Sequence, residues 1–447
     1  MNRLIKAVLP LLAAFIVFAF PAFAFAESNQ LNISKGTENG KTVISCETEI
    51  KSLYIRFAKE PGEWTLENEA GKSFKGGANG FMHEYVDVAQ ALGSGASKLY
   101  MSFPNGVKPE KIYAFDDTDV PDWVQIWQPP CEKADFMLIS THADDEQLFF
   151  AGILPYYAQV RGYEVQVVYA TDHYSQISRH HERLDGLWAV GIRHYPVSMG
   201  LVDAYSESYE GAIANLKAKG VSEQDVIDLQ TKMIKRFEPQ VIATHDVNGE
   251  YGHGQHKMVN GTLQKACANA ENDFPYLKKI YFHLYDQNQV VLNFLDEPYA
   301  ELGGLTPFQV TQVGFGFHES QHWTWFKRWL LGNNGEITKA SQINTYSPMQ
   351  YGMFYGNAAA DTAKDDFFEN VMSYEEQRIE AERIAEEQRL EEERLEAERQ
   401  AALEAEAAYR HKMNMIKAAA AAGAVAVIAL VLLLRGSSKK KKYKGRH

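Results

Sequence analysis

The sequence predicts a mixed α/β protein with a doubly wound, mostly parallel sheet, a small all-β module before it, and a long charged helix and one transmembrane helix after it. Three observations predict this class. Strand-like and helix-like segments alternate from residue 135 onward. Short strand-like segments separated by Gly and Pro fill the region before them. A run rich in Glu and Arg near the end of the 447-residue chain leads into an uncharged apolar run.

The centre of the chain carries the alternating pattern. Its predicted strands are Phe136–Thr141, Val165–Thr171, His194–Leu201, Val241–His245 and Ile280–Leu284. Helix-like segments such as Arg179–Val190 and Asp225–Phe237 lie between them. This order is typical of parallel βαβ units in a Rossmann-like sheet. Since ligands bind beyond the carboxyl ends of the strands in such sheets, we expect the chemistry there.

Residues 27–130 predict a separate β-rich module. Its predicted strands are Leu53–Ala58, Trp64–Glu69, Tyr85–Val88, Leu99–Phe103 and Ile112–Phe115. Prolines at 121, 129 and 130 then mark a linker. Trp64, Trp123 and Trp127 either form a sugar-stacking platform or pack in the interior, and packing is the favoured interpretation.

Three cysteines fall in the predicted mature chain. Cys46 and Cys131 bracket the β-rich module, and we expect them to form a disulfide because an exported chain lies where disulfides persist. Cys267 lies in an Ala-rich helical stretch and is expected to be buried and free. The cysteines lack clustered spacing, which argues against a structural zinc knuckle.

The first 26 residues have the layout of a secretory signal peptide. Arg3 and Lys6 precede an apolar run from Ala7 to Phe20, and small residues end at Ala26. We expect cleavage after Ala26. An uncleaved anchor is the alternative, although the apolar run is short for a membrane span.

The other end predicts a stalk (373–415), a transmembrane helix (416–435) and a basic cytoplasmic tail (436–447). The run Ala418–Leu434 is uncharged and is followed by Arg435 and four lysines, so the basic flank is expected to stay in the cytoplasm and the domains before it outside the cell membrane. A buried Ala-rich helix is the alternative. Apolar stalk residues repeat at a spacing of eleven, which favours a nearly straight solitary helix over a heptad coiled coil, with a homo-oligomer as the other possibility.

The charge of the chain excludes one class of function. The formal net charge is −13, but the stalk segment Glu375–Ala407 alone holds thirteen Glu and five Arg. The acidity is therefore local. No basic stripe lies in the body of the chain, so nucleic-acid binding is not expected.

Two clusters of polar residues follow predicted strands. His142, Asp144 and Asp145 come directly after the first strand of the α/β region, where acidic residues either bind a metal or cap the next helix. His253 and His256 follow the strand Val241–His245 and are three residues apart at the start of a helix. Both clusters end parallel strands, so their side chains are expected to meet and to supply donors for a catalytic metal.

Four ordered segments resemble the PIG-L/LmbE-like de-N-acetylase family between residues 135 and 321. Residues 141–146 (Thr-His-Ala-Asp-Asp-Glu) resemble its AHPDDE-type loop, and Gly249–His256 resembles its later GHxDH-type loop. Arg179 and Glu182 on one helix, and His318–Gln321, resemble its RxxE and HxSQ elements. We therefore expect a deacetylase domain over 131–372.

The resemblance implies a role for each matching residue. His142, Asp145 and His256 would bind one Zn²⁺, and Asp144 would be the general base. His253 and Tyr251 would stabilise the oxyanion. Arg179 would bind substrate, with an ion pair to Glu182 as the structural alternative. Ala143 replaces the family's proline, and Gln255 replaces an acidic residue that would lie beside His253.

Two functions are compatible with these features. The first is a zinc-dependent hydrolase that removes acetyl groups from a GlcNAc-type glycan or glycolipid at the outer face of the membrane. The second is a non-catalytic glycan-binding surface protein with a relic deacetylase domain. Retention of His142, Asp144, Asp145, His253 and His256 favours the enzyme.

Overall fold

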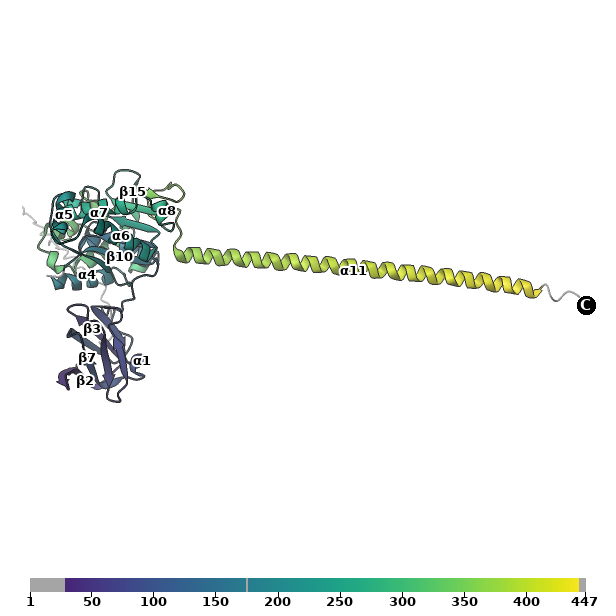
Figure 1. Cartoon of the computed structure of the whole chain (residues 1–447), viewed down its shortest axis with the longest axis horizontal. Helices are drawn as coiled ribbons and strands as arrows, with labels where there is room; N and C mark the ends of the chain where they lie inside the picture. Colours follow the sequence, from purple (N-terminus) through teal and green to yellow (C-terminus); the bar gives the residue numbers. More distant parts are fainter. Residues whose placement is uncertain (1–28, 174–175, 442–447) are drawn as a thin grey trace, which may run out of the picture. The chain divides into compact units, whose positions relative to one another are not determined.

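The structure is a computed structural model that describes residues 29–173 and 176–441, with side chains up to residue 436 (Figure 1). Contacts divide the chain into two units, residues 1–371 and 372–447. The mixed α/β class is confirmed. The predicted signal peptide and residues 442–447 of the predicted tail lie outside the described residues. The predicted domain boundaries stay predictions.

The N-terminal region contains two antiparallel sheets. Its strands are β1 (Ser34–Glu38), β2 (Lys41–Ile50), β3 (Ser52–Phe57), β4 (Trp64–Asn68), β5 (Ser73–Gly76), β6 (His83–Asp87), β7 (Ala96–Ser102) and β8 (Pro109–Phe115). One sheet has the order β1-β2-β7-β4-β5, the other β6-β3-β8. A single apolar cluster takes buried side chains from both, for example Leu99 and Ile55, so the sheets pack face to face. One short helix, α1 (Val88–Leu92), belongs to the same region.

The tryptophans and cysteines of this region have structural surroundings. Trp64 is fully buried, and Trp127 packs against Trp188 and Tyr195 of the α/β region, which confirms the packing interpretation for these two. The predicted Cys46–Cys131 disulfide is wrong, because both cysteines are free. Cys46 donates toward the Asn32 carbonyl, whereas Cys131 is buried near His194 and Glu164. Enclosing a module in sequence does not bring two cysteines together in space.

A seven-stranded sheet forms the α/β region, in the order β11-β10-β9-β12-β13-β15-β14. Its strands are β9 (Phe136–Ser140), β10 (Val165–Asp172), β11 (Val197–Val202), β12 (Val241–Thr244), β13 (Lys279–His283), β14 (Gln289–Val291) and β15 (Gln350–Gly356). β11, β10, β9, β12 and β13 are parallel to one another, whereas β15 pairs antiparallel with β13 and with β14.

Helices cover both faces of this sheet because alternate strand residues point to opposite sides. Phe136 and Leu138 belong to one buried cluster with helices α4 and α9, while Met137 and Ile139 belong to the other with α5, α6 and α7. The helices are α2 (Asp145–Leu148), α3 (Ile153–Pro155), α4 (Ile177–Ala189), α5 (Tyr209–Lys217), α6 (Glu223–Phe237), α7 (Gly254–Ala266), α8 (Ala270–Asp273), α9 (Pro307–Phe315) and α10 (Trp325–Leu331). The α/β region also contains short helical turns: a π-helical turn at Tyr156–Val160 and 3₁₀ turns at Glu250–Gly252, Asn293–Asp296, Ala300–Leu302, Glu319–Gln321 and Ala340–Gln342.

The order of the strands reverses between β9 and β12, which is the topological switch point of the sheet. From β9 the chain continues outward on one side through β10 and β11, and it returns to the other side of β9 at β12. Ligands of doubly wound sheets bind where the strand order reverses in this way, beyond the carboxyl ends of the two strands. Both polar clusters of the sequence follow these two strands.

The second unit is one helix, α11 (Tyr374–Lys441), 68 residues long (Figure 1). At 1.5 Å per residue it extends about 100 Å. It runs without interruption through the predicted stalk and the predicted transmembrane segment. Among the described residues, α11 contains the one helical stretch that is long and apolar enough to cross a membrane.

Candidate active site

Two loops build the site, one after β9 (residues 141–146) and one after β12 (residues 245–256). With Arg179 of α4, they bring together all seven residues that the sequence predicted. Two of the seven have positive φ angles that are unusual for residues other than glycine, 141° at Asp144 and 45° at Tyr251. Gly249 has a φ of 64°, and a Cβ there would lie 2.5 Å from the His253 carbonyl oxygen. Such conformations are held only where the surrounding structure enforces them, and they concentrate at functional sites.

Three donor atoms of the predicted metal ligands converge at nearly equal distances. His142 Nδ1 lies 3.1 Å from Asp145 Oδ2, and His256 Nε2 lies 3.3 Å from the same oxygen and 3.2 Å from His142 Nδ1. Donors about 2.0–2.1 Å from one tetrahedral metal ion lie roughly 3.3 Å apart. All three side chains are buried. The donor set therefore fits a small divalent cation, with one position left for a further ligand.

The hydrogen bond of the His142 ring to Gln255 involves Nε2, so Nδ1 is the nitrogen that can bind a metal ion. The His142 Nε2 lies 3.2 Å from Gln255 Oε1 and 3.5 Å from Asp203 Oδ1, so the ring donates from Nε2, and Nδ1 is the nitrogen that faces Asp145. Burial opposes protonation, but Asp145 and Asp203 raise the pKa of His142 to about 10. The Gln255 amide also donates to the Val202 carbonyl, at 2.9 Å. The side chain of Gln255 thus serves His142, not His253 as the sequence suggested.

His256 is oriented by a buried carboxylate. Its Nδ1 donates to Glu250 Oε2 at 2.6 Å, which leaves Nε2 free to face Asp145. The same carboxylate accepts from His245 at 2.8 Å and from His283 at 2.7 Å. Burial alone would raise the pKa of Glu250, but these imidazoles hold it well below its usual range. A carboxylate behind a histidine fixes the tautomer and makes the ring a better metal ligand.

Two further histidines lie within reach of the same centre. The side chains of His142, His253 and His256 offer donors within 4.8 Å of one another, and so do those of Asp145, His245 and His256. His245 is not available as a ligand, because its Nε2 accepts the Thr141 N–H at 2.9 Å and its Nδ1 donates to Glu250. His253 is therefore the remaining histidine near the centre. It is not one of the three closest donors, which are His142, Asp145 and His256.

His253 and Tyr251 are both suited to donate a hydrogen bond. The Nδ1 of His253 accepts the Gln255 N–H at 3.2 Å, so its proton lies on Nε2. Burial, with His142 and His256 nearby, lowers the pKa of His253 to about 2, which keeps the ring neutral. Burial, together with Asp145 and Asp144, raises the pKa of Tyr251 above its usual range, so its hydroxyl stays protonated. The two rings contact each other, with centroids 5.4 Å apart.

Asp144 lies beside the three donors in a different environment from Asp145. Burial raises the pKa of Asp144 above its usual range, although the Arg179 guanidinium opposes this. His256 and His142 hold the pKa of Asp145 well below its usual range, against the effect of burial. The pKa values of these two adjacent carboxyl groups are therefore shifted in opposite directions. Such a difference suits one group to proton transfer and keeps the other charged.

Arg179 holds the first loop. Its Nη2 donates to the Ala143 carbonyl at 2.5 Å and lies 3.3 Å from Asp144 Oδ1. Glu182 has other partners, since it accepts from the backbone and the hydroxyl of Ser320 at 2.9 and 2.6 Å. The side chain of Arg179 is buried, so it reaches the centre mainly through the loop that carries Asp144.

Several supporting residues were missed or set aside by the sequence interpretation. The sequence predicts no role for Glu250, His173 or His283. His173 accepts the Ala143 N–H at 3.3 Å and contacts Asp203. His318, from the HxSQ-like segment, lies 3.0 Å from Glu146, which in turn accepts the Asp144 N–H. The available signal was the number of histidines and acidic residues at strand ends, which exceeds what three metal ligands need.

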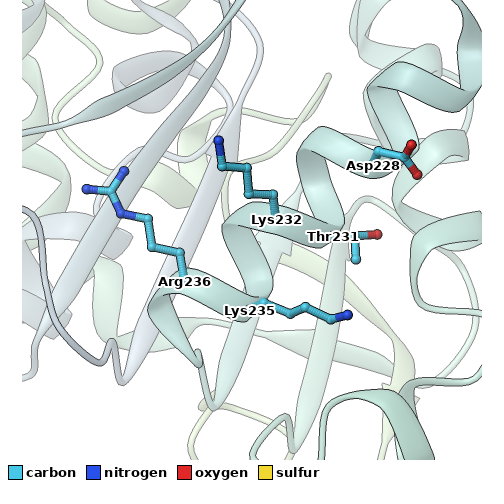
Figure 2. Close-up of a pocket in the computed structure, with 5 residues that line it drawn as sticks. All are labelled: Asp228, Thr231, Lys232, Lys235 and Arg236. Carbon is cyan, nitrogen blue, oxygen red and sulfur yellow. The ribbon is translucent and has the colours of Figure 1, made fainter.

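One pocket lies on α6 and is lined by the side chains shown in Figure 2: Asp228, Thr231, Lys232, Lys235 and Arg236. None of the residues that converge after β9 and β12 lines it. This surface hollow is therefore separate from the site that the two loops form.

Comparison with known proteins gives one family. Residues 137–267 match the sequence model of PIG-L, described as GlcNAc-PI de-N-acetylase. The matched segment begins in β9, ends after α7 and includes both loops. No curated protein is significantly similar in sequence to the chain.

Solved structures with a related arrangement include the conserved protein TT1542 from Thermus thermophilus, with 15% identity, coverage of 51% of this chain and 97% of that one, and a TM-score of 0.35. The N,N'-diacetylchitobiose deacetylase from Pyrococcus horikoshii has 18% identity, coverage of 51% and 85%, and a TM-score of 0.31. A zinc-inhibited form of teicoplanin deacetylase Orf2 has 14% identity, coverage of 42% and 84%, and a TM-score of 0.30.

Proposed function

We propose that this protein is a zinc-dependent deacetylase that hydrolyses the acetamide group of an N-acetylated amino sugar, in a GlcNAc-type glycan or glycolipid. The match of residues 137–267 to the PIG-L family model supports this proposal. The observation that carries the proposal is the convergence of His142 Nδ1, Asp145 Oδ2 and His256 Nε2 at 3.1–3.3 Å from one another, next to Asp144. The three side chains would hold one Zn²⁺ per chain. The ion would acidify a water molecule and polarise the acetyl oxygen.

Asp144 is the proposed general base. Its carboxyl group takes a proton from the attacking water as the oxygen adds to the acetyl carbon. The same group then gives a proton to the sugar nitrogen as the C–N bond breaks, which releases acetate and a free amine. A pKa raised by burial suits a group that must both accept and return a proton near neutral pH.

His253 and Tyr251 are the proposed oxyanion donors. The negative charge that develops on the acetyl oxygen needs hydrogen-bond donors that are already in place. Neutral His253 offers Nε2–H, because its Nδ1 is occupied by the Gln255 N–H. Tyr251 offers its hydroxyl. Neither donor needs to be charged.

Arg179 is proposed to act on Asp144 as well as on substrate. Its bonds to the Ala143 carbonyl and its approach to Asp144 hold the strained loop in which the base lies. A buried guanidinium also favours the charged, proton-accepting form of Asp144. Direct binding of substrate remains part of the proposal for this residue.

The proposed location is the cell membrane, with the N-terminal domains outside and the C-terminus in the cytoplasm. The support is the signal-like start of the chain, the apolar segment of α11 and the lysines that follow it. Protease added to intact cells is expected to release a soluble, active fragment that ends within the stalk. Full protection of the domain from the protease would contradict the proposed orientation and place the domain on the cytoplasmic side.

The test of the activity is acetate release by the purified full chain from a panel of N-acetylated amino sugars, with zinc content measured on the same samples. We expect about one zinc per chain and acetate from at least one member of the panel. Metal-free protein that binds glycans without releasing acetate would favour the alternative, a glycan-binding protein with a relic domain.

A further inference from the structure

A row of aromatic rings passes over the catalytic centre. The ring centroid of Tyr205 lies 5.2 Å from that of His253, the centroid of Tyr251 lies 5.4 Å from that of His253, and the centroid of Trp325 lies 5.8 Å from that of Tyr251. Tyr205 comes from the loop after β11, and Trp325 is the first residue of α10. Two segments far apart in the sequence thus place rings at the same centre.

The outer rings of this row are exposed to solvent, which is costly for side chains of their size. Tyr205 is 64% exposed and Trp325 is 41% exposed, whereas Trp64 and Trp127 of the same chain are buried. Trp323, two residues before Trp325, is 85% exposed. Exposed apolar groups that gather at one place mark a surface that binds something.

Hydrogen bonds fix the backbone beside Tyr205, and ring contacts fix the side chain of Trp325. The carbonyl of Tyr205 accepts from the Asn215 amide at 3.0 Å, and the preceding Ala204 N–H donates to Gln255 Oε1 at 3.1 Å. Trp325 packs against Phe326 at 4.4 Å and against Trp329 at 6.2 Å. A segment that is fixed before binding, and a packed ring such as that of Trp325, lose little conformational freedom when a ligand arrives.

We propose that Tyr205 and Trp325, at the two ends of this series of ring contacts, are sugar-stacking positions, and that the substrate is a chain of several linked sugar units. The inference rests on the proposed function, since an N-acetylated sugar at His253 would have its neighbours directed along this row. Sugar rings present apolar C–H faces that pack on aromatic rings while their hydroxyl groups remain in water. A single sugar at the centre would leave both outer rings unused.

The experiment measures binding separately from turnover. Full-length protein carrying Asp144→Asn is titrated with N-acetylglucosamine and with its β-1,4-linked oligomers of two to four units. We expect the affinity to rise at least about tenfold from one unit to four. Tyr205→Ala and Trp325→Ala should each reduce the affinity for the four-unit oligomer by about threefold to tenfold, and the double variant should remove the dependence on length.

Matched variants keep the result specific. Tyr409 of α11 is 65% exposed, nearly the same as Tyr205, and Tyr409→Ala should change nothing. Trp325→Phe and Tyr205→Trp keep a ring at each position and should retain most of the length dependence. Equal affinity for one and four units, or an unchanged length dependence in the double variant, overturns the proposal. A surface that instead contacts lipid or protein would give that result.

Acetate release by protein with Asp144 intact separates this proposal from the proposed function. If kcat/KM for deacetylation is the same for one and four units, the proposed stacking positions are contradicted and the proposed hydrolase activity is supported. If binding depends on oligomer length but no oligomer releases acetate, the proposed hydrolase activity is contradicted and the stacking positions are supported. Absence of both binding and acetate release overturns both.

Discussion

The proposed catalytic centre is buried and the stalk part of helix α11 is exposed to solvent, yet both contain short contacts between a carboxylate and a nitrogen donor. At the centre, Glu250 accepts from His256 at 2.6 Å and from His283 at 2.7 Å, and all three side chains are fully buried. On α11, Arg389 contacts Glu386 at 2.6 Å with both side chains more than half exposed. The distances are alike. The difference lies in how much solvent each contact excludes.

This difference sets what each contact contributes. An exposed ion pair is screened by water and salt and loses side-chain freedom, so it adds little to stability. A buried carboxylate has already lost its hydration, so removal of one partner leaves a charge or a donor without compensation. We therefore expect the effects of substitution to decrease from the metal ligands to their buried supports and then to the stalk.

The largest effect is expected at the catalytic centre. His142→Ala, Asp145→Ala and His256→Ala should each lose metal and activity together, because each removes one of three donors. Asp144→Asn should keep the metal and lower kcat by about 10²–10⁴-fold, since the amide cannot take the proton. Zinc content and acetate release measure both properties, and His411→Ala on α11 is the control histidine. If Asp144→Asn loses metal while Asp145→Ala keeps it, the roles of the two carboxyl groups are inverted.

The next effect is expected at Glu250, behind His256. Glu250→Gln keeps the size of the side chain but removes the charge that three imidazoles face, so we expect a loss of about 3–5 kcal/mol in stability. Zinc affinity should fall about 10–100-fold, because His256 loses the group that orients it. Denaturant unfolding and competition with a chelator measure the two effects.

The matched control for Glu250 is Glu406→Gln on α11, whose carboxylate contacts Arg410 at 2.6 Å in solvent. We expect no measurable change in zinc affinity or in unfolding of the first unit. Similar losses for Glu250→Gln and Glu406→Gln would show that burial does not separate the two regions.

The sequence identified the residues of the centre better than the way they support one another. His142, Asp144, Asp145 and His256 were predicted because they lie in two short segments that follow strands and that resemble the two motifs of a known family. The role of Glu250 was not predictable in this way, since it depends on imidazoles at positions 245, 256 and 283 that only the fold brings together.

Two other interpretations failed for geometric reasons. Gln255 follows His253 by two residues, but side chains two apart at the start of a helix do not face each other, so Gln255 reaches His142 instead. Cys46 and Cys131 enclose one module, yet they lie on segments with separate contacts. The α/β class was predictable because alternation of strands and helices is a local pattern, while side-chain partners depend on topology.

A smaller effect is expected at Gln255, the neutral support of His142. Gln255→Leu removes the acceptor of the His142 Nε2–H and should weaken zinc binding by about tenfold, the lower end of the usual range, because Asp203 remains 3.5 Å away. Gln255→Glu supplies a charged acceptor and should bind zinc at least as tightly as the wild type. Chelator competition measures both, with Gln224→Leu on the surface of α6 as control. Unchanged affinity in Gln255→Leu would assign the orienting role to Asp203 alone.

The smallest effect is expected on the stalk, where Arg389 contacts Glu386 at 2.6 Å and Glu393 at 3.6 Å. Arg389→Gln removes these contacts while keeping a residue of similar helix propensity, so backbone amides near position 389 should exchange hydrogen only about twofold faster at low salt. The difference should disappear in about 1 M salt, where charges are screened within about 3 Å. Hydrogen exchange of the full chain at both salt concentrations is the measurement. A change above about tenfold, or one that persists in high salt, would mean that solvent is excluded from this face. The exposed Ile384 and Leu390 would then lie against a second copy of the helix, as the homo-oligomer interpretation of the sequence requires.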